Sequence, residues 1–225
     1  MAATERFDFS KLRKEGDEYT ARLLKIFEYP LGKLVIQYTA LKPNQMSLIS
    51  FIVGVSSIIV LIQGGYKYTL IGAALTSVYL LCDMLDGQIA RVKGITSRFG
   101  KWIDGMLSFM LIPLMLLALG IGLKSYQGLL FGAIAALCFP LQFTFIYYYK
   151  AEIQEGIQRI SIPGSKGIQK LRYVYGTTLF FPLLLIGAII NRPLYVLIFF
   201  AVFGSLYWMI LLATITFNLW CDDAR

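Results

Sequence analysis

Long hydrophobic runs separated by short polar segments dominate the chain from residue 45 onward. A helix needs roughly 20 apolar residues to cross a bilayer, and several runs approach or exceed that length. Glycine, proline and polar residues mark short connections typical of helix hairpins, as at Gly64–Gly65 and Lys124–Ser125. The pattern predicts an all-α integral membrane protein with six transmembrane helices, at about 45–63, 68–89, 102–122, 127–149, 174–191 and 193–218.

A shorter amphipathic stretch precedes these spans. Between residues 21 and 31 the apolar side chains share one helical face and the charged ones the other, which predicts a helix lying in the membrane interface. A cytoplasmic helix that packs on the protein itself is the alternative. Pro30 and Gly32 are expected to end this helix. The sequence thus divides into an N-terminal cytoplasmic region with a juxtamembrane helix, 1–42, and a six-helix membrane domain, 43–225.

The basic residues predict the orientation of the spans. The segments through Lys42, from Arg91 to Lys101, from Lys150 to Arg172 and at the C-terminus hold 18 of the 21 Lys and Arg residues, and the three alternate loops hold one each. The positive-inside rule then places both termini in the cytoplasm. This distribution accounts for the net charge of +8 without a nucleic-acid partner.

Three acidic residues stand out because they fall within or at the edge of apolar spans. These are Asp83, Asp86 and Asp104, of 13 acidic residues in the chain. Carboxylates at membrane depth are costly and usually mark a functional site. The first two lie on one helical stripe and the third on the next span after a short cytoplasmic loop, so we expect the two helices to be neighbours and the three acids to meet just below the cytoplasmic surface.

The composition limits what these acids can bind. The chain contains no His, and its three Cys residues form no CxxC pair, so neither a disulfide framework nor a thiolate metal site is indicated. Ligation by oxygen alone favours Mg²⁺, Mn²⁺ or Ca²⁺. Gly87 and Ala90 leave a groove beside the carboxylates, and Arg91 supplies a cation suited to a phosphate. Together these residues predict phosphoryl chemistry on a lipid.

The stretch from Asp83 to Ser108 resembles the signature of the CDP-alcohol phosphotransferase family, D-x2-D-G-x2-A-R-x8-G-x3-D-x3-D. Seven of its fixed residues match, namely Asp83, Asp86, Gly87, Ala90, Arg91, Gly100 and Asp104. The segment from Pro43 to Ser47 resembles the P-N-x-x-[ST] pattern that often precedes the family's first span. With the six spans, the resemblance covers nearly the whole chain.

The resemblance implies a fold, a reaction and a site. A membrane-embedded enzyme would pass a phosphatidyl-like group from a CDP-linked lipid to a small alcohol and release CMP. The three acids would hold two Mg²⁺ or Mn²⁺ ions. The CDP moiety would contact a set of small and polar residues: Asn44, Gly87, Ala90, Arg91, Ser97 and Gly100. A homodimer in the inner or plasma membrane, or its equivalent, is also expected.

One signature position departs from the family. Its last Asp, usually a metal ligand and the proposed general base, is Ser108 here. The chain is therefore an engineered inactive variant, an enzyme with another base, or a family-like protein without catalysis, and the sequence does not separate these. An enzyme that delivers phosphocholine or phosphoethanolamine to a lipid acceptor is a further alternative, disfavoured by chain length. A transporter is disfavoured because the spans show no duplicated halves.

The loop after the fourth predicted span is the candidate acceptor site. If the acceptor carries a phosphate, cations there must face the cleft, and the candidates are Lys150, Arg159, Lys166, Lys170 and Arg172. The alternative is a solvated connector whose basic residues only reflect membrane orientation.

Overall fold

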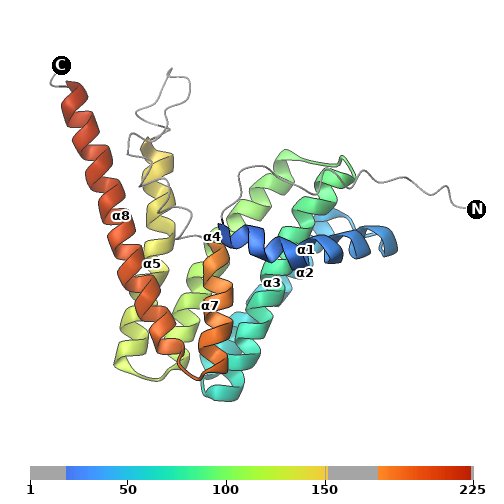
Figure 1. Ribbon diagram of the computed structural model, residues 1–225, viewed down its shortest axis with the longest axis horizontal. Helices are drawn as coiled ribbons and strands as arrows, with labels where there is room; N and C mark the ends of the chain where they lie inside the picture. The colour runs from blue at the N-terminus through green and yellow to red at the C-terminus, as the bar shows by residue number, and fades with distance from the viewer. Residues whose placement is uncertain (1–18, 150, 152–176, 224–225) are drawn as a thin grey trace, which may run out of the picture.

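The computed structural model describes residues 19–149, 151 and 177–223. All of its elements are helices (Figure 1), namely α1 Tyr19–Tyr38, α2 Pro43–Gln63, α3 Tyr66–Val92, α4 Arg98–Gly122, α5 Tyr126–Tyr148, α7 Thr177–Ile189 and α8 Pro193–Asp223. The helical prediction is confirmed for this part of the chain. The observed helices begin and end within a few residues of the predicted spans.

Five helices are long and apolar enough to cross a membrane: α2, α3, α4, α5 and α8. The predicted span 174–191 corresponds to α7. This helix is apolar, but its 13 described residues are too few to cross a bilayer. Residues 152–176, which precede α7, lie outside the described part. Six spans therefore remain a prediction, while five candidate spans are observed.

Helix α1 corrects the prediction that Pro30 and Gly32 end the amphipathic helix. It continues to Tyr38 with Pro30 inside it. Packing explains why it does not stop: Ile36 is buried with Leu85 and Ile89 of α3, and Gly32 lies against the Gln88 side chain, where a Cβ would not fit. Tertiary contact thus offsets the hydrogen bond that a proline removes. In Figure 1, α1 runs across the long helices such as α3. The position of α1 relative to a bilayer stays a prediction.

Helix α2 lies at the centre of the arrangement that positions the site. It packs against both α3 and α4, and these two contact each other far less than either contacts α2. The expectation that α3 and α4 are close neighbours is therefore corrected, because α2 fills most of the space between them. On the other side α4 packs on α5, and α5 packs along α8 (Figure 1).

Small residues allow the close helix contacts. A Cβ on Gly72 of α3 would lie 2.5 Å from Cδ2 of Leu61 on α2. A Cβ on Gly120 of α4 would lie 2.6 Å from the Gly128 carbonyl oxygen of α5 and 3.0 Å from the Gly132 Cα. The G128-L-L-F-G132 pattern therefore lies at a helix interface, as small-xxx-small patterns in membrane helices often do.

Candidate active site

A cleft of about 420 Å³ opens where α2 begins, α3 ends and α4 begins. This volume is within the range of small-molecule sites. The cleft brings together eight of the residues predicted from the sequence, which are Asn44, Asp86, Gly87, Ala90, Arg91, Ser97, Gly100 and Asp104. Signature residues from both halves of the motif therefore share one cavity.

The local structure explains how α3 and α4 reach the same cleft. Helix α3 ends after Val92, and Gly94 adopts the left-handed conformation, φ +67°, that lets the chain reverse. Ser97 then caps α4 by accepting a hydrogen bond from the Gly100 backbone N–H at 2.9 Å. The connection is also tied to the segment that precedes α2, because Lys93 Nζ donates to the Leu41 carbonyl oxygen at 2.9 Å.

Asp86 is the more buried of the two acids that line the cleft. It is buried, and its Oδ2 accepts a hydrogen bond of 2.6 Å from the Ser47 hydroxyl of α2. Hydrogen bonds to a charged group contribute about 1.5–3 kcal/mol. Ser47 and Asp86 both line the cleft, so the hydrogen bond holds one carboxylate oxygen toward α2 at the cleft wall.

The other two acids differ in position. Asp104 is exposed and lines the cleft, whereas Asp83 is half-buried and is not among the lining residues. The three carboxylates lie close enough for their charges to act on one another. Their oxygen donors have the chemistry that Mg²⁺ or Mn²⁺ requires.

No metal site is assembled by these side chains as they lie. Within the described ranges, no group of three or more His, Cys, Asp or Glu residues is arranged to hold a metal ion. The carboxylate oxygens are suitable ligands for a divalent ion, but the three acids do not converge on one point. Metal binding by Asp83, Asp86 and Asp104 therefore stays a prediction.

Arg91 is one of two basic residues, with Lys101, among the described residues that line the cleft. Its Nε is buried and has no hydrogen-bond partner among the described residues. A Cβ on Gly87 would lie 3.1 Å from Arg91 Nη1, so this glycine makes room for the guanidinium group. A buried donor without a partner is unusual, and an anionic ligand in the cleft would satisfy it.

Gly100 lies at the other wall of the cleft, next to Ser97 and Asn44. A Cβ there would lie 3.1 Å from the Ser97 hydroxyl oxygen and 3.8 Å from Oδ1 of Asn44. The first turn of α4 can therefore lie beside the first turn of α2. The Ser97 oxygen accepts the capping bond, and its hydroxyl hydrogen remains available to a ligand.

Ser108 does not line the cleft. It is half-buried on α4, and its hydroxyl oxygen lies 3.4 Å from the hydroxyl oxygen of Tyr79 on α3. Tyr79 is 1% exposed. The position where the family carries an acid thus faces a neutral hydroxyl group in this protein.

Sequence reasoning did not assign several residues that the structure places here. Pro43, Ser47, Ile95, Thr96 and Lys101 line the cleft. Ser47 ends the P-N-x-x-[ST] pattern, which was a usable signal. Tyr79 lies one helical turn before Asp83, and that spacing could also have found it. The predicted acceptor residues from Lys150 to Arg172 lie outside the described residues.

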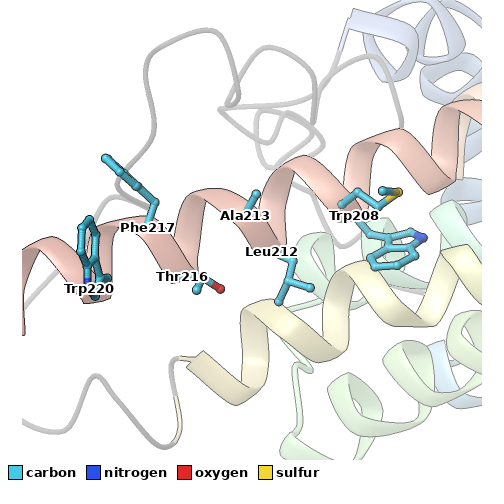
Figure 2. Close-up of a pocket in the computed structure, with 7 residues that line it drawn as sticks. Trp208, Leu212, Ala213, Thr216, Phe217 and Trp220 are labelled. Carbon is cyan, nitrogen blue, oxygen red and sulfur yellow. The ribbon is translucent and has the colours of Figure 1, made fainter.

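A larger hollow of about 530 Å³ lies along α8 and has a different character (Figure 2). Among the described residues, those that line it all come from α8, and they include Trp208, Leu212, Phe217 and Trp220. Thr216 is the hydroxyl-bearing residue of this set. Because no charged residue belongs to this described set, the smaller polar cleft is the candidate active site.

Comparison with known proteins places the chain in a family. A family model described as CDP-alcohol phosphatidyltransferase matches residues 40–220. The bifunctional IPC transferase and DIPP synthase of Aquifex aeolicus is 32% identical over 94 residues, which cover 41% of this chain and 20% of that protein. The phosphatidylinositol phosphate synthase of Corynebacterium glutamicum is 35% identical over 75 residues, 33% of each chain. The matched segments thus span a third or less of these relatives, whereas the family model spans most of this sequence. The chain belongs to the CDP-alcohol phosphatidyltransferase family.

Proposed function

We propose that this protein transfers a phosphatidyl-like group from a CDP-linked lipid, of the CDP-diacylglycerol type, to a small polar alcohol and releases CMP. One observation carries the proposal: six of the seven matched signature residues line a single cleft at the ends of apolar helices. A site in this place can take a soluble nucleotide from one side while the lipid chains stay in the bilayer. The distribution of basic residues favours the cytoplasmic side.

In the proposed reaction an alcohol oxygen attacks the phosphorus atom that carries the lipid. A new phosphorus–oxygen bond forms, the pyrophosphate bond breaks, and CMP leaves with the bridging oxygen. The alcohol proton passes to a base or to water. Arg91 would bind the pyrophosphate through its guanidinium group, and the part of the cleft lined by Gly87 and Ala90 would take the cytidine.

Asp83, Asp86 and Asp104 would hold two Mg²⁺ or Mn²⁺ ions. Such ions neutralise developing charge and stabilise the leaving phosphate when bound. The protein's own contribution is to fix the carboxylates, as Ser47 does for Asp86, and to place Arg91 beside them.

For the acceptor we propose a small polar alcohol. One relative is a phosphatidylinositol phosphate synthase, which makes inositol phosphate the first acceptor to test. Single Ala variants of Lys150, Arg159, Lys166, Lys170 and Arg172 should raise the KM for such an acceptor. Unchanged acceptor KM in all five would favour a neutral alcohol.

A second candidate function is nucleotide-lipid binding without catalysis. It is favoured by Ser108, which pairs with the neutral hydroxyl of Tyr79 where the family has a carboxylate. A serine hydroxyl is a poor general base near neutral pH.

The deciding experiment measures CMP release. Purified protein in nanodiscs is given radiolabelled CDP-diacylglycerol, Mn²⁺ and a panel of alcohols, with the Asp104→Asn variant as control. Alcohol-dependent CMP release that the variant lacks supports the transferase. Lipid-nucleotide binding that Asp104→Asn removes, with no CMP released with any alcohol, supports the binding function instead. Cross-linking in the same nanodiscs tests the expected homodimer.

A further inference from the structure

We propose that Ser47 is a positioning residue for Asp86: its hydroxyl fixes one carboxylate oxygen so that the other is presented to ligands in the cleft. This inference rests on the proposed function of Asp86 as a metal-binding residue and adds a residue from α2 to that site.

The geometry is that of a strong, enclosed hydrogen bond. Ser47 is 7% exposed and Asp86 is 5% exposed, and the distance between Ser47 Oγ and Asp86 Oδ2 is 2.6 Å. Hydroxyl donors reach carboxylates at 2.5–2.7 Å when the bond is charge-assisted. The Pro43 carbonyl oxygen, at 3.2 Å, is the other acceptor within reach of the single hydroxyl hydrogen. The shorter bond to the charged group is the stronger of the two.

A fixed orientation matters because an aspartate carboxyl group rotates easily. Its last torsion angle is broad and only weakly restrained by the side chain itself. Without Ser47, Asp86 would keep the backbone hydrogen bond from Gly87 but lose the side-chain hydrogen bond that holds Oδ2 toward α2.

Ser47 is itself held in place. It lies in the first turns of α2, which starts with Pro43 and is capped where the Lys42 backbone N–H donates to Gln45 Oε1 at 2.9 Å. The start of α2 is also tied to the end of α3 through Lys93 and Leu41. The hydroxyl thus reaches Asp86 from a second, firmly anchored helix.

The test is Mn²⁺ binding by the purified full chain, followed by electron paramagnetic resonance of the free ion. Groups that hydrogen-bond a metal-ligating carboxylate typically contribute about 10–100-fold to metal affinity. We therefore expect Ser47→Ala to weaken Mn²⁺ binding by about 10–100-fold, and Ser47→Thr to restore it to within a fewfold because the hydroxyl returns. Turnover of Ser47→Ala should recover at saturating Mn²⁺.

Ser50→Ala is the matched control. Ser50 is also buried on α2, but its hydroxyl donates to the backbone carbonyl of Tyr79 at 3.3 Å, not to a carboxylate. It should lose thermal stability to a similar degree while keeping the Mn²⁺ affinity of the parent.

The outcomes separate this inference from the proposed function. If Asp86→Asn loses Mn²⁺ and Ser47→Ala keeps it, Asp86 remains a ligand and the role of Ser47 is overturned. Equal weakening by Ser47→Ala and Ser50→Ala also overturns it, because a general packing defect would then be the cause. A parent protein that binds no Mn²⁺ overturns both proposals.

Discussion

The two sides of the helix bundle are held together by different interactions. Between α2 and α3, buried hydroxyl groups form hydrogen bonds at several levels. Ser57 Oγ lies 2.6 Å from Thr76 Oγ1 and donates to the Gly72 carbonyl at 3.0 Å, and nearer the cleft Ser50 and Ser47 reach Tyr79 and Asp86. These polar contacts run along the helix pair that carries the cleft.

Between α5 and α8 most contacts are aromatic and aliphatic, beside a contact of 3.3 Å between Cys138 Sγ of α5 and Ser205 Oγ of α8. Phe145 of α5 and Trp208 of α8 lie with ring centroids 5.9 Å apart, and Leu211 and Ile215 of α8 pack with Ile146 of α5. Aromatic pairs contribute about 0.5–1.5 kcal/mol beyond area burial and tolerate some sliding. Hydrogen bonds between specific hydroxyls fix the helix register more closely, and a site built across α2, α3 and α4 depends on that register.

The largest expected effect comes from the acids of the polar side. Asn at Asp83, Asp86 or Asp104 should abolish metal-dependent binding of CDP-lipid, because each change removes a charged ligand from a group of three. Equilibrium binding of labelled CDP-diacylglycerol with and without Mn²⁺ measures this.

The control for these variants lies on the apolar side. Thr216→Val in the α8 hollow is close to isosteric and removes a polar group that is not assigned to the cleft. It should leave CDP-lipid affinity as in the parent. Unchanged CDP-lipid affinity in all three Asn variants would contradict the proposal that these acids bind a metal.

A second large effect is expected at Ser108. Asp at this position would lie beside the Tyr79 hydroxyl, which could donate to it, one helical turn after Asp104. General-base catalysis typically contributes about 10²–10⁴-fold. Ser108→Asp should therefore raise alcohol-dependent CMP release by at least about a hundredfold, with little change in CDP-lipid affinity.

Two results would contradict this expectation. Parent protein that already turns over as fast as Ser108→Asp would mean that another group takes the proton. Ser108→Asp that binds CDP-lipid and stays inert with every alcohol would favour the non-catalytic function.

The sequence predicted the cleft better than it predicted the packing around it. Six of the eight assigned residues that line the cleft belong to the signature, which fixes spacing along two helices, and helical geometry turns that spacing into a shared face. The limits of α3 and α4 followed in the same way from the length of their apolar runs.

Contacts between segments far apart in the sequence could not be predicted from apolar periodicity or motif spacing. The continuation of α1 past Pro30 depends on Ile36 packing against α3, and the place of α2 between α3 and α4 depends on which faces interlock. Ser47 and Tyr79 belong to this class, since each acts through a partner on another helix. Local periodicity does not identify such partners.

The close contact between α4 and α5 connects the polar side of the bundle, α2 and α3 with α4, to the apolar side, α5 and α8. A glycine substitution tests how much this contact contributes to stability. Gly120→Ala would place a Cβ 2.6 Å from the Gly128 carbonyl, so the backbones must move apart. Overpacking of this kind costs about 1–3 kcal/mol. Thermal unfolding in detergent should show a lower Tm than the parent.

Gly105→Ala makes the same change on the same helix without a contact. Among the described residues, no atom beyond its chain neighbours and the helix's own backbone lies within 4 Å of the added Cβ, and alanine favours a helix by about 0.5–1 kcal/mol over glycine. Its Tm should rise slightly. A fall in Tm of equal size for both variants would mean that the α4–α5 contact is not the cause.

The smallest effect is expected on the outer face of α8. Phe217 is 61% exposed and lines the apolar hollow, whose other walls are also residues of α8 (Figure 2). Phe217→Ala removes a side chain that contacts little of the protein, and changes at such positions usually stay within about 0.5 kcal/mol, or roughly twofold in an equilibrium. CMP release and Tm should both remain close to the parent. A tenfold loss of CDP-lipid affinity in this variant would show that the α8 hollow takes part in binding the lipid substrate. The division between a polar side that holds the reactants and an apolar side that only packs would then no longer hold.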